Sequence, residues 1–354
     1  MRRTSPGSAQ TSQTRWSATT PAAARSSLAG GQPGLSRRQW LAVLALAPAV
    51  RALAAEPDEF RGIFPIVATP YRDDGKVDLQ TLAKEVRFLD RAGVHGIVWP
   101  QLASEYALLT FEERIAGAEA IVKASEGLRP KVVIGVQAAD TETAVRYAEH
   151  AKSIGPDAII ALPPRKGRQT EFDLDAVARY YEAVAEAGGL PMIMQAIGNM
   201  SVEFVARMVR EIPNLHFVKD EAGHTLSRLT EFDELSGPDR PVAFTGGHGR
   251  TLIEEMARGS AGTMPAASWV DLYVKVWDLW HAGQRSDAME MFSRALLLIT
   301  KASAHGLPAL AYVLHLRGVF PNWKVRTSSA RELDRHAREQ LEATLEFVRP
   351  HLTA

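Results

Sequence analysis

Short apolar runs alternate with amphipathic segments along most of the chain. Each run has the length of a buried strand, and each intervening segment has apolar residues at helical spacing. Gly93 just after one such segment, and Thr110 with Glu113 at the start of the next, are helix-boundary signals. The expected strands span residues 62–70, 94–100, 131–137, 157–164, 190–195, 215–220, 241–247 and 261–266. The expected helices between them span residues 77–93, 110–125, 141–155, 173–187, 201–212, 225–236 and 251–259.

Strands this continuously apolar are typical of a parallel sheet covered by helices on both faces. Eight strand–helix repeats predict an α/β fold, a closed (β/α)8 TIM barrel over residues 56–266. An open doubly wound sheet is the alternative. Its dinucleotide-binding form is disfavoured because no Gly-x-Gly-x-x-Gly opens a helix after a strand. The nearest approach, residues 246–249, fits a tight turn better.

The strand pattern stops after residue 266. The remaining residues, 267–354, are expected to form a C-terminal helical appendage packed on the barrel. Its expected helices span residues 269–282, 286–303, 307–316 and 330–348.

The first 55 residues differ from the rest. Residues 1–34 are rich in Ser, Thr, Ala, Gly and Arg and are expected to be disordered. Arg37 and Arg38 precede an apolar stretch, residues 41–50, that is too short to span a bilayer. Residues 52–54 fit a small-x-small cleavage site. The segment resembles a twin-arginine export signal, so we expect a periplasmic protein with no membrane anchor after cleavage. The alternative is a basic tail that runs into an ordinary short helix.

Composition narrows the function classes. Lys plus Arg and Asp plus Glu are equal at 41 each, which argues against a nucleic-acid-binding protein. The absence of cysteine excludes disulfides, thiolate nucleophiles and Cys-ligated metals. The ten histidines show no paired ligand spacing, so we expect no metal site.

A TIM barrel places its chemistry at the carboxyl ends of its strands. Lys219 is the only lysine at the end of an expected core strand, and Asp220 and Glu221 follow it at once. Burial in an apolar pocket lowers the pKa of an amine, and a neutral amine attacks a ketone to form a Schiff base. The protonated imine then draws electrons from an adjacent C–C or C–O bond. The alternative is a solvated strand end. Thr69, Ser104, Glu105, Gln195, Gly246 and Thr263 also stand at expected strand ends or in the loops after them.

Five segments in order resemble the dihydrodipicolinate synthase/N-acetylneuraminate lyase family of class I aldolases and dehydratases. They are "FRGIFPIVATPYRDDGKVDLQTL", "SEYALLTFEER", "LHFVKDEAG", "ARGSAGTMPA" and "AYVLHLRGV". The resemblance implies a (β/α)8 barrel, a pyruvate-like 2-oxo acid held as an imine on Lys219, no cofactor or metal, and a homo-oligomer, usually a tetramer.

Two departures from the family shape the expected chemistry. The family's Gly-Thr-Thr-Gly-Glu loop is replaced by residues 101–105, where Leu102 and Ala103 lack a hydrogen-bonding side chain and Ser104 has one. The family's tyrosine at the end of strand five is replaced by Gln195, which cannot act as a general acid–base. This combination resembles the branch that dehydrates 2-keto-3-deoxy sugar acids.

The expected site has three catalytic residues and four substrate-binding residues. Lys219 forms the imine, Glu105 orients water or acts as acid–base, and Gln195 holds substrate hydroxyls. For Glu105 the alternative is a carboxylate that caps backbone N–H groups, and for Gln195 an amide satisfied by loop backbone. The expected substrate-binding residues are Ser104, Thr69, Gly246 and Thr263.

Three functions fit these residues. We expect a lyase that dehydrates a 2-keto-3-deoxy sugar acid through an imine on Lys219. The first alternative is a retro-aldolase that releases pyruvate. The second is a periplasmic 2-oxo-acid binding protein without turnover, suggested by the missing tyrosine and threonines.

Overall fold

A computed structural model describes residues 60–167, 169–237 and 240–354; the expected export signal lies outside them. Eight parallel strands form one sheet in the order β1-β8-β7-β6-β5-β4-β3-β2. They are β1 (Gly62–Ile63), β2 (Gly96–Trp99), β3 (Lys131–Gly135), β4 (Ala158–Ala161), β5 (Met192–Ala196), β6 (Leu215–Asp220), β7 (Val242–Thr245) and β8 (Gly262–Thr263).

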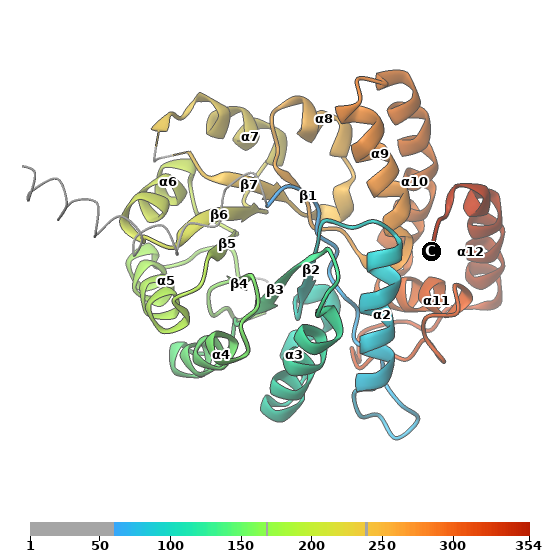
Figure 1. The fold of residues 1–354 in the computed structure, drawn as a ribbon, viewed down its shortest axis with the longest axis horizontal. Helices are drawn as coiled ribbons and strands as arrows, with labels where there is room; N and C mark the ends of the chain where they lie inside the picture. The colour runs from blue at the N-terminus through green and yellow to red at the C-terminus, as the bar shows by residue number, and fades with distance from the viewer. Residues whose placement is uncertain (1–59, 168, 238–239) are drawn as a thin grey trace, which may run out of the picture. The chain divides into compact units, whose positions relative to one another are not determined.

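The sheet closes on itself beside Ile66. Ile66 bridges to Val98 on one side and to Ala266 on the other, and Val67 N donates to Val98 O at 3.0 Å. Figure 1 shows the strands as a ring with the helices outside it. The prediction of a TIM barrel is confirmed. The first expected strand pairs over fewer residues than its apolar run, because Pro65 and Pro70 have no N–H to donate to a ladder.

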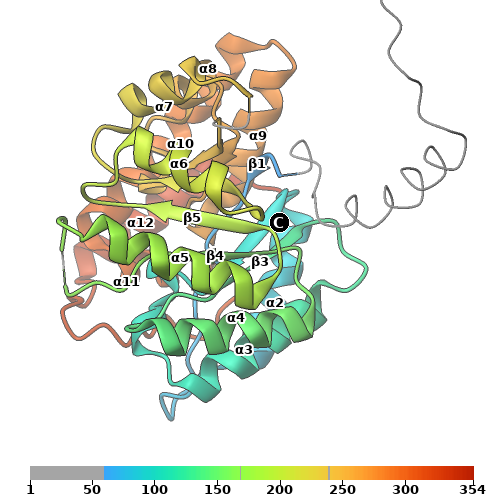
Figure 2. The same ribbon diagram turned by 90° about the vertical axis from the view of Figure 1, so that its left-hand side faces the viewer.

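Helices alternate with the strands, and Figure 2 shows α3 to α6 along the outside of the barrel. The helices of the repeats are α2 (Leu79–Arg91), α3 (Phe111–Ser125), α4 (Thr141–Ile154), α5 (Leu174–Gly188), α6 (Val202–Glu211), α7 (Thr225–Glu234) and α8 (Leu252–Ala257). The expected capping box at α3 is present: Glu113 N donates to Thr110 Oγ1, and Thr110 N donates to Glu113 Oε2.

The barrel has an inner and an outer core. Residues that alternate along the strands point inward, and Phe64, Phe217 and Phe244 pack there with smaller residues. Their neighbours in sequence, such as Val218, point outward against the helices. Large side chains fill the interior of the barrel below the strand ends.

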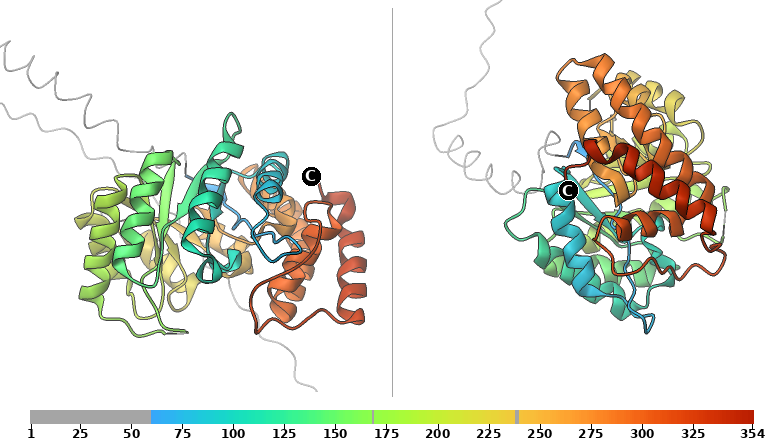
Figure 3. Two further views of the ribbon diagram at one scale, coloured as in Figure 1. Left: turned by 90° about the horizontal axis from the view of Figure 1, so that it is seen from below. Right: turned by 90° about the vertical axis from the view of Figure 1, so that its right-hand side faces the viewer.

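The chain after β8 is helical and packs beside α2 (Figures 1 and 3). Its helices are α9 (Val270–His281), α10 (Arg285–His305), α11 (Leu307–Leu316) and α12 (Arg335–Val348). A buried ion pair at 2.7 Å joins Arg317, the residue after α11, to Asp271 of α9, and the Arg317 guanidinium lies 4.6 Å from the ring centre of Phe88 in α2. The last helix begins later than the expected residue 330, because Asp334 caps it by accepting from Ala337 N at 2.7 Å.

Candidate active site

Lys219 and Gln195 are register partners on the neighbouring strands β6 and β5. Side chains alternate along a strand, so Lys219 points inward two residues after Phe217, and Gln195 two residues after Ile193. Lys219 is 4% exposed and Gln195 is fully buried. The structure therefore brings these two expected site residues together at the inner carboxyl rim.

Glu221 joins the two side chains. Its Oε2 lies 3.3 Å from Lys219 Nζ and accepts a hydrogen bond from Gln195 Nε2. Its Oε1 accepts from the backbone N of Gly247 at 3.2 Å. The side chain of Glu221 remains 26% exposed. A carboxylate, an amine and an amide thus converge on one point that faces solvent.

The electrostatic balance keeps Glu221 ionised. Burial on its own raises the pKa of this carboxyl, but the charge of Lys219 and the hydrogen bonds from Gly247 and Gln195 outweigh it. Together they hold the pKa below its ordinary value. Glu221 is therefore a carboxylate at neutral pH.

The side chain of Asp220 points to the opposite face of β6 from Lys219 and Glu221. It is fully buried and accepts three hydrogen bonds from Arg228 of α7, at 2.8 to 3.1 Å. Burial raises the pKa of Asp220 although Arg228 opposes it. Asp220 fixes β6 to the helix layer and does not face the pocket.

A pocket of about 310 Å³ opens over this cluster. Of the residues named above, Lys219, Glu221 and Gly247 line it. Its other lining residues are Ile66, Gln101, Leu102, Ala103, His248, Met264, Pro265, Ala266 and Leu307. The pocket lies at the carboxyl ends of the strands, where TIM barrels bind their substrates.

His248 lies on the β7 side of the pocket. Its backbone has φ 61°, and its carbonyl oxygen accepts a 2.6 Å hydrogen bond from the hydroxyl of Tyr273. Burial, reinforced by the charge of Arg250, lowers the pKa of His248. At neutral pH this imidazole is therefore uncharged and able to donate or accept a hydrogen bond.

Ser104 and Thr69 hold the loop after β2. Ser104 Oγ donates to Val67 O at 2.5 Å and accepts from Gln101 N at 3.1 Å. Thr69 Oγ1 donates to Ser104 O at 2.7 Å and accepts from Trp99 Nε1 at 3.1 Å. Both hydroxyls are committed to the loop, and neither residue lines the pocket with Lys219. Substrate binding by Ser104 and Thr69 stays a prediction that this arrangement does not favour.

Glu105 faces the C-terminal region. Its Oε1 accepts from Thr327 N at 2.6 Å and from Thr327 Oγ1 at 2.5 Å, and its Oε2 accepts from Arg326 N at 3.2 Å. Arg326 also pairs with Glu113 at 2.5 Å. Glu105 does not line the pocket with Lys219. This geometry favours the alternative that the sequence left open, a carboxylate that caps backbone N–H groups.

Gly246 and Thr263 lie near the cluster in different ways. A Cβ at residue 246 would stand 1.8 Å from Glu221 Oε1, so any larger residue here would displace the Glu221 carboxylate. Thr263 is fully buried in β8 and donates to Thr245 O at 3.4 Å. Neither residue lines the pocket; Gly246 acts by leaving room for Glu221.

Sequence reasoning gave Glu221 no role. A usable signal was present, because Lys219 and Glu221 are two residues apart and a strand places such residues on one face. Leu307 of α11 was also missed, since only the packing of the C-terminal helices brings it to the rim.

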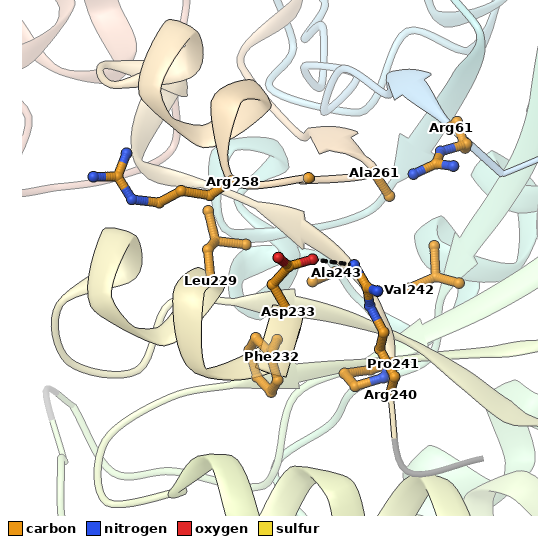
Figure 4. Close-up of a pocket in the computed structure, with 11 residues that line it drawn as sticks. Arg61, Leu229, Phe232, Asp233, Arg240, Pro241, Val242, Ala243, Arg258 and Ala261 are labelled. Carbon is orange, nitrogen blue, oxygen red and sulfur yellow. Dashed lines mark hydrogen bonds and ion pairs between the residues drawn. The ribbon is translucent and has the colours of Figure 1, made fainter. Parts of the chain in front are cut away.

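A second pocket, of about 280 Å³, lies at the opposite end of the barrel. Val242, the first residue of β7, and Ala261, just before β8, line it. Figure 4 shows Asp233 and Arg240 pointing toward each other across it, and Arg258 pointing away from this pair. Arg258 instead pairs with Glu254 at 3.1 Å. TIM barrels carry their active sites at the other end, at the carboxyl ends of the strands. This second pocket is therefore not the candidate active site.

The described part of the chain holds no group of three or more His, Cys, Asp or Glu side chains arranged to bind a metal. Within the described ranges, no helix is long and apolar enough to cross a bilayer.

Comparison with known proteins agrees with the geometry. The model of the dihydrodipicolinate synthetase family matches residues 59–348. L-2-keto-3-deoxyarabonate dehydratase of Azospirillum brasilense is 28% identical over 243 residues, 68% of this chain and 78% of that protein. The probable 2-dehydro-3-deoxy-D-pentonate aldolase of Escherichia coli is 26% identical, over 68% of this chain and 81% of that protein. The crystal structure of dihydrodipicolinate synthase from Rhodopseudomonas palustris superposes with a TM-score of 0.74 and 26% identity, covering 83% of this chain and 99% of that one.

Proposed function

The chain belongs to the dihydrodipicolinate synthetase family, and on that premise we propose that it dehydrates a 2-keto-3-deoxy sugar acid held as an imine on Lys219. The family and its named relatives support lyase activity. The observation that carries the finer proposal is the contact of Lys219 with Glu221, which Gln195 also binds.

The first step needs a neutral amine. Glu221 Oε2, 3.3 Å from Lys219 Nζ, is a proton acceptor within reach. The neutral amine attacks C2 of the 2-oxo acid, and the protonated Glu221 returns its proton to the former carbonyl oxygen, which leaves as water. An iminium ion forms and Glu221 is again a carboxylate.

Glu221 is placed to carry the next two proton transfers. As a carboxylate it removes a proton from C3, which the iminium acidifies, and an enamine forms. The enamine electrons expel the hydroxyl on C4 while the protonated Glu221 returns the proton to it, so that water leaves. Tautomerisation and hydrolysis of the imine release the dehydrated 2-oxo acid and restore Lys219. The net change is the loss of one water.

Gln195 contributes orientation. Its Nε2 donates to Glu221 Oε2, which fixes the carboxylate beside Lys219. Its Oε1 is buried and has no hydrogen-bond partner among the described residues. Gln195 does not line the pocket, so this acceptor serves only a substrate hydroxyl that enters between Glu221 and β5. A buried acceptor without a partner favours substrates that bring a donor.

Reductive trapping tests the imine. The full chain is incubated with pyruvate and with 2-keto-3-deoxy acids, then treated with borohydride and analysed by mass spectrometry. We expect an adduct on Lys219 that is absent from Lys219→Ala. Absence of any adduct with every acid would refute the imine.

Product analysis separates dehydration from the aldol alternative that the Escherichia coli relative's name supports. Dehydration keeps the carbon skeleton, whereas retro-aldol cleavage releases pyruvate and an aldehyde. Thermal stabilisation by a keto-deoxy acid with no product would instead indicate a binding protein.

Location and assembly complete the proposal. We propose export through the twin-arginine pathway, on the motif at Arg37 and Arg38, and a homotetramer, on the family resemblance. Export is tested by fractionation of cells that carry Arg37→Lys and Arg38→Lys together. Tetramer formation is tested by sedimentation of the protein. Retained periplasmic protein in the double variant, or a monomer in solution, would contradict them.

A further inference from the structure

The pocket over Lys219 has two walls of different chemistry. Strands β6 and β7 are neighbours and supply the polar wall, formed by Lys219, Glu221, Gly247 and His248. Strands β8, β1 and β2 follow each other around the ring, and their ends together with α11 supply the other wall. Its residues are Ile66, Leu102, Ala103, Met264, Pro265, Ala266 and Leu307. We call this second set the apolar wall.

No side chain of the apolar wall donates or accepts a hydrogen bond in the manner of an alcohol or amide. Gln101, the residue before Leu102, also lines the pocket and is 1% exposed. Gln101 Nε2 donates to Gln137 Oε1 at 3.1 Å. Gln101 Oε1 is buried and has no hydrogen-bond partner among the described residues, so it can accept from a ligand hydroxyl at that edge of the pocket. A hydroxyl turned toward the side chains of Leu102 and Leu307 would be buried without a partner.

The side chain of Leu102 is exposed to solvent at the apolar wall. It is 41% exposed, although its loop is fixed by the hydrogen bonds of Ser104 to Val67 O and Gln101 N. A leucine on a fixed loop cannot retreat from water, and because Leu102 lines the pocket, contact with a bound ligand would cover its apolar surface. Leu307 reaches the same wall from the first residue of α11, after Gly306 with φ 65°.

We propose that the apolar wall selects the distal part of the substrate, an inference that rests on the imine chemistry proposed above. The preferred substrate is a 3-deoxy-2-oxo acid whose chain ends in a methyl group, over the acid of equal length that ends in hydroxymethyl. Leu102 and Leu307 are the specificity-determining residues. A pocket of about 310 Å³ is at the small end for ligand sites, so the end of a short chain cannot avoid the wall.

The test compares kcat/KM of the full chain for two such acids that differ only in the terminal group. An apolar pocket rejects an added hydroxyl by about tenfold to a hundredfold, and we expect that preference for the methyl-terminated acid. Leu102→Thr supplies a hydroxyl to the wall and should bring the ratio toward one. Leu108→Thr is the matched control, because Leu108 is 45% exposed in the same loop region but does not line the pocket. It should leave the ratio unchanged.

A ratio near one in the natural protein, or an unchanged ratio in Leu102→Thr, would overturn the inference. If neither acid is turned over, the shift in Tm that each acid produces gives the same comparison. Trapping of pyruvate on Lys219 is independent of the wall because pyruvate has no distal chain. Successful trapping with no methyl preference therefore rejects the specificity alone, whereas failed trapping rejects the proposed function.

Discussion

The carboxylate of Glu221 occupies the space that a side chain at Gly246 would need. A Cβ there would lie 1.8 Å from Glu221 Oε1, and the same oxygen accepts from Gly247 N at 3.2 Å. The loop after β7 therefore sets where Glu221 stands relative to Lys219, although neither glycine has a side chain to contribute.

Gly246→Ala should abolish most activity without unfolding the barrel. The backbone at Gly246 has a negative φ, −124°, and the nearest atoms to an added Cβ all belong to the Glu221 side chain, so we expect the effect to come from displacement of Glu221. We expect kcat to fall by a factor of about 100, the order lost when one acid–base group is misplaced, with a small change in Tm. Steady-state rates and thermal melts measure both.

The control is Gly127→Ala. Gly127 has φ +74° and nothing within 4 Å of an added Cβ, so this variant experiences backbone strain but no contact with the site. It should lower Tm and leave kcat unchanged. Full activity in Gly246→Ala would show that the position of Glu221 is not critical.

Glu221→Gln should separate imine formation from proton transfer. The amide keeps the shape of the side chain but cannot accept a proton from C3 or deliver one to the leaving hydroxyl. We expect kcat for dehydration to fall by about 10²–10⁴, while borohydride still traps pyruvate on Lys219. Dehydration at the natural rate would remove Glu221 from the mechanism.

Glu105→Gln makes the same substitution at a carboxylate with different partners. Glu105 accepts from Thr327 and from Arg326 N, and an amide would turn its NH2 group toward one of these donors. We expect a loss of about 1–3 kcal/mol in the free energy of unfolding, with kcat reduced less than tenfold. Thr327→Val, which removes one donor to Glu105, should lower stability in the same direction. A fall in kcat as large as that of Glu221→Gln, at unchanged stability, would instead make Glu105 catalytic.

The barrel and part of its site could be predicted because they depend on local pattern. Each strand is buried on both faces, so its apolar run is visible in the sequence, and a strand-end lysine such as Lys219 stands out against it. Gln195 followed from the same rule. Register then brings these two together, as the parallel pairing of neighbouring strands requires.

The rest depended on contacts between distant parts of the chain. Glu221 lies one residue past the end of β6. Its spacing from Lys219 indicates the inner face, but the sequence does not show that Gln195 and Gly247 hold it beside Lys219. Arg326 and Thr327, the partners of Glu105, and Leu307 of the pocket are far from the barrel strands in sequence. They reach the rim because the C-terminal helices pack beside α2. Glu105 was expected to be catalytic because it follows the end of a barrel strand. Position after a strand does not show which residues such a side chain contacts.

Glu85 should make the protein less stable as the pH rises. This side chain in α2 is fully buried; its Oε1 accepts from Ala68 N at 3.0 Å, and its Oε2 has no partner among the described residues. Burial raises the pKa of Glu85 well above its ordinary value. Below the pKa of the unfolded chain both states are protonated and there is no penalty. Between that pKa and the raised folded pKa, the unfolded state releases a proton that the folded state keeps, so stability falls by up to about 1.4 kcal/mol per pH unit.

Glu85→Gln removes this proton and leaves a neutral side chain of the same shape. The difference in free energy of unfolding between Glu85→Gln and the natural protein should therefore shift in favour of the variant as the pH rises from 4 toward 7, where the carboxyl of the unfolded chain ionises near about 4.3. Denaturant unfolding at several pH values measures it. Glu112→Gln is the control, because Glu112 lies exposed at the start of α3 and its replacement should give a difference that does not grow in this way. Parallel curves for Glu85→Gln and the natural protein would mean that Glu85 is ionised in the folded state and has a partner for its charge.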